Sequence, residues 1–431
     1  MSLWSQAKIA AENTPAYRNR AADFFRAASI LVVVFGHWMV SVPHFVNGGL
    51  EFTKLLAVQP WTQYASWVVQ VMPIFFFVGG YSNAASWKSA RKNPEKRRSW
   101  QATRLRRLLL PTAPLVMIWA ISAGVAWAAG LDAGIIQAAS RAALVPVWFL
   151  AVYIMATVVA PITIRAWERY GLYSVALPVV ASALVDLIAF SAGIGWLRWT
   201  NYAFVWLAMH QLGYWWNGGI RSLAAPFLLA ALGAFSLILL VGPLGYPVAM
   251  VSVPGEEMSN TRPPTFAMLS IGFTQAGLIL LSSGKVADWL QDAKRWAFVI
   301  LIGQRIMTIY LWHLSTLIAV VGLSLLADGY GLRVFPGSVE WWLTRPLWLA
   351  ILFVALFPFI LIFGGIESAS RESERTLPGP VQAALGACLA CGGLTFLALK
   401  GSYAANALGV NIIPVALTIT GVALSSIGRR A

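Results

Sequence analysis

The sequence predicts an all-α, polytopic transmembrane helix bundle, and three observations lead to this prediction. Hydrophobic residues make up 59% of the 431 residues and charged residues only 11%, whereas an ordinary soluble domain carries about 25% charged residues. The apolar residues fall into runs of about 20, the length that an α-helix needs to cross a bilayer. The net charge of +15 is spread unevenly between these runs, as it is in chains whose charge sets the membrane topology.

Twelve apolar runs between polar or Gly/Pro-rich breaks are expected to span the membrane. Residues 1–22 are polar and lack the short apolar core of a signal peptide, so we expect a retained cytoplasmic segment there. A ten-helix core, 23–366, would be followed by two extra C-terminal transmembrane helices within 367–431. The twelve runs are 23–42, 64–86, 108–129, 146–165, 173–192, 201–217, 223–243, 265–283, 297–326, 346–366, 381–399 and 411–427.

The basic residues predict how these helices are oriented. If the N-terminus is inside and the helices alternate, 22 of the 31 lysines and arginines lie on the cytoplasmic side and seven on the outer side. Cytoplasmic loops of membrane proteins are enriched in Lys and Arg. The asymmetry therefore predicts that both termini are cytoplasmic and that the charge serves topology rather than nucleic-acid binding.

The first run contains two residues that hydrocarbon penalises, Arg26 and His37. Eleven residues turn an α-helix by three turns plus about 20° and advance it by about 16 Å, so both side chains lie on one face. Arg26 would lie near the cytoplasmic surface and His37 beyond the midplane. In a purely structural interpretation, Arg26 snorkels and His37 bonds a neighbouring helix, but the shared face favours a polar path into the membrane.

The next two runs contain a helix break and a basic cluster. Pro73, Gly79 and Gly80 interrupt the second run, which indicates either close helix packing or a water-filled cavity. Nine basic residues follow within 88–107. Such a cluster sets topology or binds anionic lipid, or it binds a phosphorylated ligand, since guanidinium groups donate paired hydrogen bonds to phosphate. The arginines best placed for the last role are Arg104, Arg106 and Arg107.

Further polar residues occur later in the chain. Cys388 and Cys391 lie in an apolar run with no other ligands nearby, so we predict no metal site. The loop at 244–264 is expected to lie over an outward-facing site. Packing explains a buried histidine as well as function does, but these residues are candidates for a secondary site: Tyr81, Trp148, His210, Arg305, Tyr310 and His313.

Five short patterns, taken in order, resemble those of a known family. An Arg followed after ten residues by a His occurs at Arg26 and His37, and the others are Pro73–Tyr81, Arg104–Pro111, Trp148–Leu150 and Gly303–His313. In this order and spacing they resemble acyltransferase family 3, the bacterial integral-membrane O-acyltransferases. The resemblance covers about residues 20–366. This chain departs from the pattern by its two additional helices, and we expect no attached esterase-like domain.

The resemblance implies an O-acyltransferase of the bacterial inner membrane. Its co-substrate would be cytoplasmic acyl-CoA, most simply acetyl-CoA, with no tightly bound cofactor. The acceptor would be a hydroxyl of a cell-envelope glycan or glycolipid at the outer side, and the Arg- and Ala-rich composition favours a trehalose-type glycolipid. His37 would be the catalytic base or acyl carrier. Arg26 and the three arginines at 104, 106 and 107 would bind the donor, and membrane lipids would be the remaining partners.

A secondary transporter or exporter of an envelope precursor is the alternative function. Intramembrane Arg and His residues and broken helices are also features of transporters. The sequence lacks a repeated half with matching broken helices, which argues against this alternative. A lipid-binding scaffold would leave the Arg26–His37 pair without a role. Turnover of acyl-CoA by the purified protein would distinguish these classes.

Overall fold

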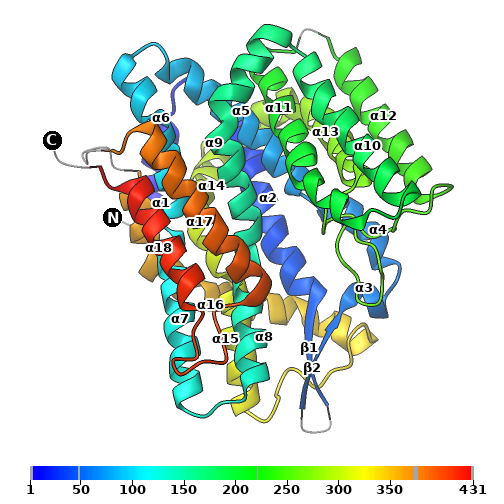
Figure 1. Cartoon of the computed structure of the whole chain (residues 1–431), viewed down its shortest axis with the longest axis vertical. Coiled ribbons are helices and arrows are strands. Elements are labelled where there is room, and N and C mark those ends of the chain that lie inside the picture. The colour runs from blue at the N-terminus through cyan, green and yellow to red at the C-terminus, as the bar shows by residue number, and fades with distance from the viewer. Residues whose placement is uncertain (1–2, 47–48, 221, 372–376, 429–431) are drawn as a thin grey trace. The chain divides into compact units, whose positions relative to one another are not determined.

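The computed structural model describes residues 3–46, 49–220, 222–371 and 377–428, and most of them are helical (Figure 1). Within this part of the chain, ten helical segments are long and apolar enough to cross a membrane, which confirms the predicted all-α polytopic bundle. The elements are α1 (Leu3–Glu12), α2 (Arg20–Val40), β1 (Ser41–Val46), β2 (Gly49–Lys54), α3 (Leu55–Val58), α4 (Thr62–Val69), α5 (Met72–Ala90), α6 (Pro94–Leu109), α7 (Thr112–Ala128), α8 (Ala133–Leu144), α9 (Pro146–Tyr170), α10 (Tyr173–Ser191), η1 (Gly195–Thr200), α11 (Asn201–Gly218), α12 (Ala224–Val241), α13 (Phe266–Trp289), α14 (Ala293–Gln304), α15 (Ile306–Leu326), α16 (Val339–Ala369), α17 (Pro380–Lys400) and α18 (Ile412–Ser426).

Two of the twelve predicted spans, 201–217 and 411–427, are not among these ten segments. Helix α18 has 15 residues, so it is about 22 Å long and shorter than the roughly 30 Å hydrocarbon core. Helix α11 has the expected length but buries polar side chains that lower its mean hydropathy, among them His210 and Gln211. Both predicted segments are therefore helices, but apolar length alone does not assign them to the membrane.

Two other predicted spans are broken. The run at 64–86 forms α4 and α5, because Pro73 lies in the first turn of α5, where its missing N–H costs nothing. The run at 297–326 forms α14 and α15, and Arg305 between them has a φ of −123° and a ψ of 16°, outside the helical region. The first run is thus broken near Pro73, as its sequence indicated, and it belongs to one candidate span, Thr62–Ala90. The prediction of one spanning helix over 297–326 was wrong, because only Ile306–Leu326 is a candidate span there.

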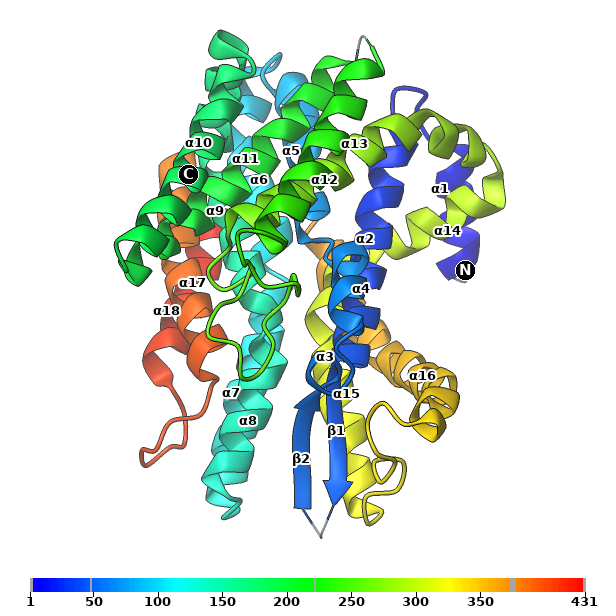
Figure 2. The same ribbon diagram turned by 90° about the vertical axis from the view of Figure 1, so that its right-hand side faces the viewer.

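Local structure also appears where the sequence predicted connections. Strands β1 and β2 follow α2 and pair as a two-stranded sheet, which Figure 2 shows beyond the end of that helix. The basic cluster at 88–107 was expected between helices, but most of it forms α6. Asn93 caps this helix by accepting a hydrogen bond from the Lys96 N–H, and Pro94 begins it.

The chain forms two compact units, each built from three stretches of sequence. The first contains residues 1–42, 52–86 and 160–304, and the second contains 43–51, 87–159 and 305–431.

Close helix crossings organise the first unit. A Cβ on Gly80 of α5 would collide with the carbonyl group of His210 in α11, and one on Gly213 would meet the carbonyl group of Phe77. The glycines of the second run therefore permit close packing, one of the two alternatives that the sequence left open. At the other side of this unit, α1 lies along α14 (Figure 2), where the Trp296 Nε1 donates to Thr14 Oγ1 at 2.7 Å.

The two extra C-terminal helices belong to the second unit. Helices α17 and α18 lie side by side (Figure 1) and pack on α6, α7 and α8. Gly386, Ala390 and Gly393 form a stripe of small residues along α17, and Gly386 and Ala390 lie opposite Gly421 of α18. A Cβ on Gly386 would lie 2.8 Å from the Gly421 carbonyl oxygen. Backbones can approach this closely only where side chains are absent or small.

Candidate active site

Helix α2 positions the two residues that the sequence singled out. Asn19 caps its start, where the Asn19 side chain accepts from the Ala22 N–H at 3.0 Å, and Asp23 lies in the first turn, where a negative charge is favourable. The helix continues without a break to Val40, so Arg26 and His37 lie on one helix, about 16 Å apart along its axis. Both side chains are half-buried.

Arg26 lies at a point where three patterns of the sequence meet. Its Nη2 donates to Asp23 Oδ1 at 2.9 Å. The same Nη2 faces Gly303 of α14, and a Cβ added to Gly303 would lie 4.0 Å from it. Tyr81 of α5 is close to Asn19 and Asp23. The Nε of Arg26 is buried and has no hydrogen-bond partner among the described residues. A buried donor without a partner is costly, so this guanidinium can donate one more hydrogen bond to an acceptor group.

The other end of α2 meets the loop at 244–264. Leu56 packs with Ala249 and Val253, and Val40 at the end of α2 joins this cluster. The loop is bonded along α4: Trp67 Nε1 donates to the Val248 carbonyl at 2.7 Å. Gln70 Nε2 likewise donates to the Met250 carbonyl at 2.7 Å. The loop expected to cover an outward-facing site is therefore an ordered cap on this end of the unit.

The three arginines of the basic cluster differ in their surroundings. All three lie in α6 of the second unit. Arg104 is half-buried and Arg107 is exposed. Arg106 is buried, and its Nη2 donates to the Ala369 carbonyl at the end of α16 at 3.1 Å. Arg106 therefore takes part in helix packing, which the sequence did not indicate.

The late pattern forms a separate cluster in the second unit. Tyr310 is buried, and its hydroxyl donates to the Pro146 carbonyl at 2.6 Å. The Tyr310 ring also lies 5.8 Å from that of Phe149, the residue after the half-buried Trp148. His313 is fully buried, and its Nδ1 lies 2.6 Å from the Tyr310 carbonyl oxygen. The structure thus brings the start of α9 and the late pattern together.

Arg305 marks the break before α15 and is bonded to α16. Its Nη1 donates to the Gly364 carbonyl at 3.1 Å and to Ser368 Oγ at 2.5 Å. These bonds fasten the break between α14 and α15 to the neighbouring helix, which is a structural role.

His210 lies in a chain of polar contacts inside the first unit. Asn83 Nδ2 lies 3.0 Å from His210 Nε2, and the Tyr214 hydroxyl lies 2.9 Å from His210 Nδ1. Thr163 Oγ1 contacts the same hydroxyl at 2.8 Å. Both ring nitrogens therefore have partners in a buried environment, which supports the packing interpretation for this residue.

Two buried carboxylates were not predicted from the sequence. Glu367 of α16 accepts hydrogen bonds from the backbone N–H groups of Met307 and Thr308, at 3.2 and 2.9 Å, and so caps α15. Asp186 of α10 accepts from the Phe266 N–H at 2.7 Å and caps α13. A charged residue inside an otherwise apolar run is a signal that could have identified Asp186, whereas Glu367 follows directly after the run at 346–366.

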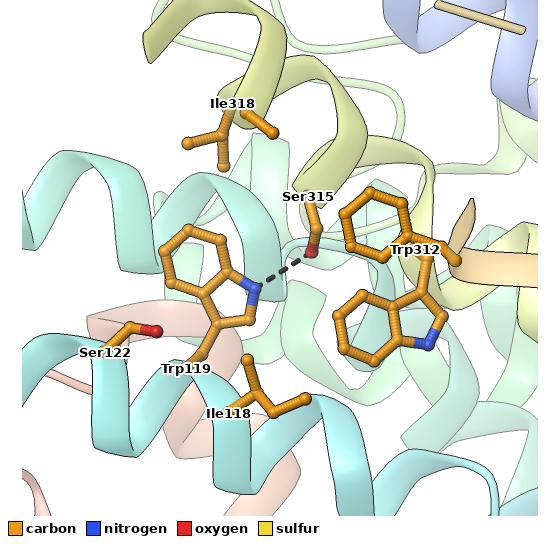
Figure 3. Close-up of a pocket in the computed structure, with 8 residues that line it drawn as sticks. Ile118, Trp119, Ser122, Trp312, Ser315 and Ile318 are labelled. Carbon is orange, nitrogen blue, oxygen red and sulfur yellow. Dashed lines mark hydrogen bonds between the residues drawn. The ribbon is translucent and has the colours of Figure 1, made fainter. Parts of the chain in front are cut away.

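A mostly apolar pocket opens between α7, α15 and α16 of the second unit (Figure 3). Figure 3 shows Trp119 and Ser315 pointing toward one another, and the Trp119 Nε1 donates to Ser315 Oγ at 2.9 Å. The lining of this pocket holds no ionisable side chain, so the pocket offers no acid or base for catalysis. The other lining residues are Ile118, Ser122, Trp312, Ile318, Ala319 and Phe359.

Comparisons with known proteins agree with the family suggested by these patterns. Among the described residues, no group of three or more His, Cys, Asp or Glu side chains is arranged to hold a metal ion. Neither a curated protein nor a solved structure shows significant similarity to the chain. A family model described as an acyltransferase domain matches residues 19–365. This match includes Arg26 and His37, covers most of the chain, and ends before α17. The chain therefore belongs to acyltransferase family 3 and is a membrane acyltransferase.

Proposed function

We propose that the protein transfers an acyl group, most simply acetyl, from cytoplasmic acyl-CoA to a hydroxyl of a cell-envelope glycan or glycolipid at the outer side of the bacterial inner membrane. Both termini are cytoplasmic in this proposal, in keeping with the 22-to-7 asymmetry of basic residues. The observation that carries the proposal is the continuity of α2 from Arg26 to His37. One helix can therefore bind the charged end of the donor and reach its thioester.

Arg26 is proposed to bind a phosphate of the donor. Its buried Nε lacks a hydrogen-bond partner among the described residues, and its Nη2 is already held by Asp23. Charge-assisted hydrogen bonds from a guanidinium to phosphate are among the stronger ones. The three arginines of α6, Arg104, Arg106 and Arg107, are proposed to bind the donor as well, and Arg106 also donates to the Ala369 carbonyl.

His37 is proposed to act as the base. The imidazole takes the proton of the acceptor hydroxyl as its oxygen attacks the thioester carbonyl. The new C–O bond forms, the C–S bond breaks, and the CoA thiolate leaves and takes up the proton. In a two-step variant the imidazole nitrogen attacks first, the C–S bond breaks and the CoA thiolate leaves. The hydroxyl oxygen then attacks the acyl-imidazole, the C–N bond breaks to release the imidazole, and the thiolate takes up the hydroxyl proton. The half-buried position of His37 near the end of α2 fits either course.

The test is transfer of radiolabelled acetyl from acetyl-CoA by the purified protein, with donor binding measured separately. We expect His37→Ala to lower transfer at least 100-fold, the usual contribution of a positioned base, while donor affinity changes little. Arg26→Ala should weaken donor binding by about tenfold, as the loss of one charge-assisted hydrogen bond would.

Arg18→Ala is the matched control. Arg18 also pairs with Asp23, at 2.7 Å, but its side chain is exposed, so we expect nearly unchanged kinetics. Wild-type turnover in His37→Ala would end the catalytic assignment of His37, and His313 would become the next candidate.

A further inference from the structure

Lys54 is a half-buried cation for which the described part of the chain supplies no ionic partner. It ends β2, and its Nζ donates to the Ser252 carbonyl at 2.9 Å. Within the described residues it forms no ion pair. Burial lowers the pKa of Lys54, and the positive charge of Arg262 lowers this pKa further. A charged group held in this way destabilises the fold unless a function or a ligand compensates for it.

Arg262 places a second positive charge in the same region. It lies in the 244–264 loop, its side chain is exposed, and it is close to Tyr202 at the start of α11. The loop also contains Glu256 and Glu257, which are exposed and form no ion pair with either cation among the described residues. The fold therefore brings two like charges together although acidic side chains occur in the same loop.

The scaffold around these two cations is held by hydrogen bonds and belongs wholly to the first unit. Ser252 Oγ and Ser259 Oγ lie 2.9 Å apart, and Ser259 Oγ accepts from the backbone N–H groups of Thr261 and Arg262, at 3.1 and 3.3 Å. The Met250 N–H, two residues before Ser252, is bonded to Ser66 of α4 at 2.8 Å. Hydrogen bonds thus hold the ammonium group of Lys54 and the backbone of Arg262.

The pair lies at the His37 end of α2, away from Arg26. Leu56, two residues after Lys54, packs with Val40 and with the loop, and Figure 2 shows α3 and α4 beside the end of α2 from which β1 continues. Lys54 is also within electrostatic range of His37. An anion bound here would approach His37 from the side opposite to the proposed donor.

We infer that Lys54 and Arg262 form an anion-binding site that takes a phosphate or carboxylate group of the acceptor and directs its hydroxyl toward His37. The inference rests on the proposed function for its link to the reaction, but the site itself is defined by the two cations. It limits the acceptor to an anionic glycan or glycolipid, such as a phosphorylated or uronic-acid sugar. A neutral sugar would leave both positive charges without a counter-ion.

The test is equilibrium dialysis of radiolabelled inorganic phosphate against the full-length protein in detergent. Lys54→Ala and Arg262→Ala should each weaken phosphate binding at least tenfold, and Lys54→Arg should stay within about threefold of wild type. Saturating coenzyme A in the dialysis occupies the proposed donor site at Arg26. Under these conditions Arg26→Ala and His37→Ala should leave the remaining phosphate binding unchanged, which separates the site from that of the donor. Arg333→Ala is the matched control, because Arg333 is an exposed basic residue already paired with Asp328.

Competition with sugars identifies the anion. Glucose 6-phosphate and glucuronate should displace the phosphate and glucose should not, and the better competitor of the two shows whether phosphate or carboxylate is preferred. Phosphate binding that survives in both alanine variants, or equal displacement by glucose, would overturn the inference. If the site binds phosphate but His37→Ala keeps its transfer activity, the anion site stands and only its assignment to the acceptor fails.

Discussion

Helix α2 and the region from Arg305 to His313 each contain an arginine and a histidine in apolar sequence, yet the structure treats the two pairs differently. In α2 the helix is unbroken, both side chains are half-buried, and the Nε of Arg26 has no partner among the described residues. In the second region the helix breaks at Arg305, which is bonded to α16, and His313 is fully buried beside the Tyr310 carbonyl.

The difference shows that an intramembrane Arg or His does not by itself indicate function. Hydrocarbon makes both residues costly, and the cost can be met by contacts within the protein as well as by a substrate. Around Arg305 and His313, contacts within the protein compensate for much of this energetic cost. Around Arg26 such contacts compensate for only part of the cost, and the proposed mechanism is therefore assigned to α2.

The largest effect is expected at Glu367, which holds the second region together. Its carboxylate is buried, caps the first turn of α15, and pairs with Arg371 at 2.8 Å. Glu367→Ala leaves the N–H groups of Met307 and Thr308 unpaired, so we expect a loss of about 3 kcal/mol in the free energy of unfolding. A thermal melt in detergent measures it. The control is Glu340→Ala in the same helix, where the side chain is exposed, and an equal loss there would contradict the capping role.

His313→Ala should have a smaller effect on stability and sharpens the comparison directly. It removes a fully buried ring and its contact with the Tyr310 carbonyl, so we expect a loss of about 1–3 kcal/mol. Transfer activity, measured below the melting temperature, should fall much less than in His37→Ala, which should keep wild-type stability. A 100-fold loss of transfer at unchanged stability would reverse the roles of the two regions.

The smallest effect concerns the pH dependence of stability at Lys54. Its pKa in the folded protein is lowered, whereas an unfolded lysine has a pKa of about 10.4. Between these two values the unfolded chain binds more protons, so the free energy of unfolding rises with pH. The effect is small because solvent still reaches a half-buried ammonium group.

Melting temperatures across this alkaline range should therefore show wild type gaining stability relative to Lys54→Met. Lys8→Met, which changes an exposed lysine in α1, should follow the wild-type profile. If the difference in melting temperature between wild type and Lys54→Met does not change with pH, the Lys54 ammonium group is solvated as in an unfolded chain.

Much of the architecture followed from local sequence, because hydropathy and residue order act along one segment at a time. The apolar runs predicted helices throughout the chain, and the eleven-residue spacing predicted a shared face for Arg26 and His37 within one helix. Helix α2 is continuous over both residues. The ordered patterns also identified the family that the comparison with family models assigns.

What the sequence could not predict depends on contacts between distant segments. The sequence shows that Arg305 lies in an apolar run. It does not show that Arg305 donates to the carbonyl of Gly364, 59 residues later, which holds the break between the two helices against α16. The capping role of Glu367 has the same origin, since a carboxylate shows its partner only after folding. Likewise, Lys54 and Arg262 are unremarkable loop cations in the sequence. In the tertiary structure Lys54 is bonded to Ser252, which lies in the same loop as Arg262. This contact brings the two positive charges together. The sequence does not show it, because electrostatic interaction depends on distance in space and not along the chain.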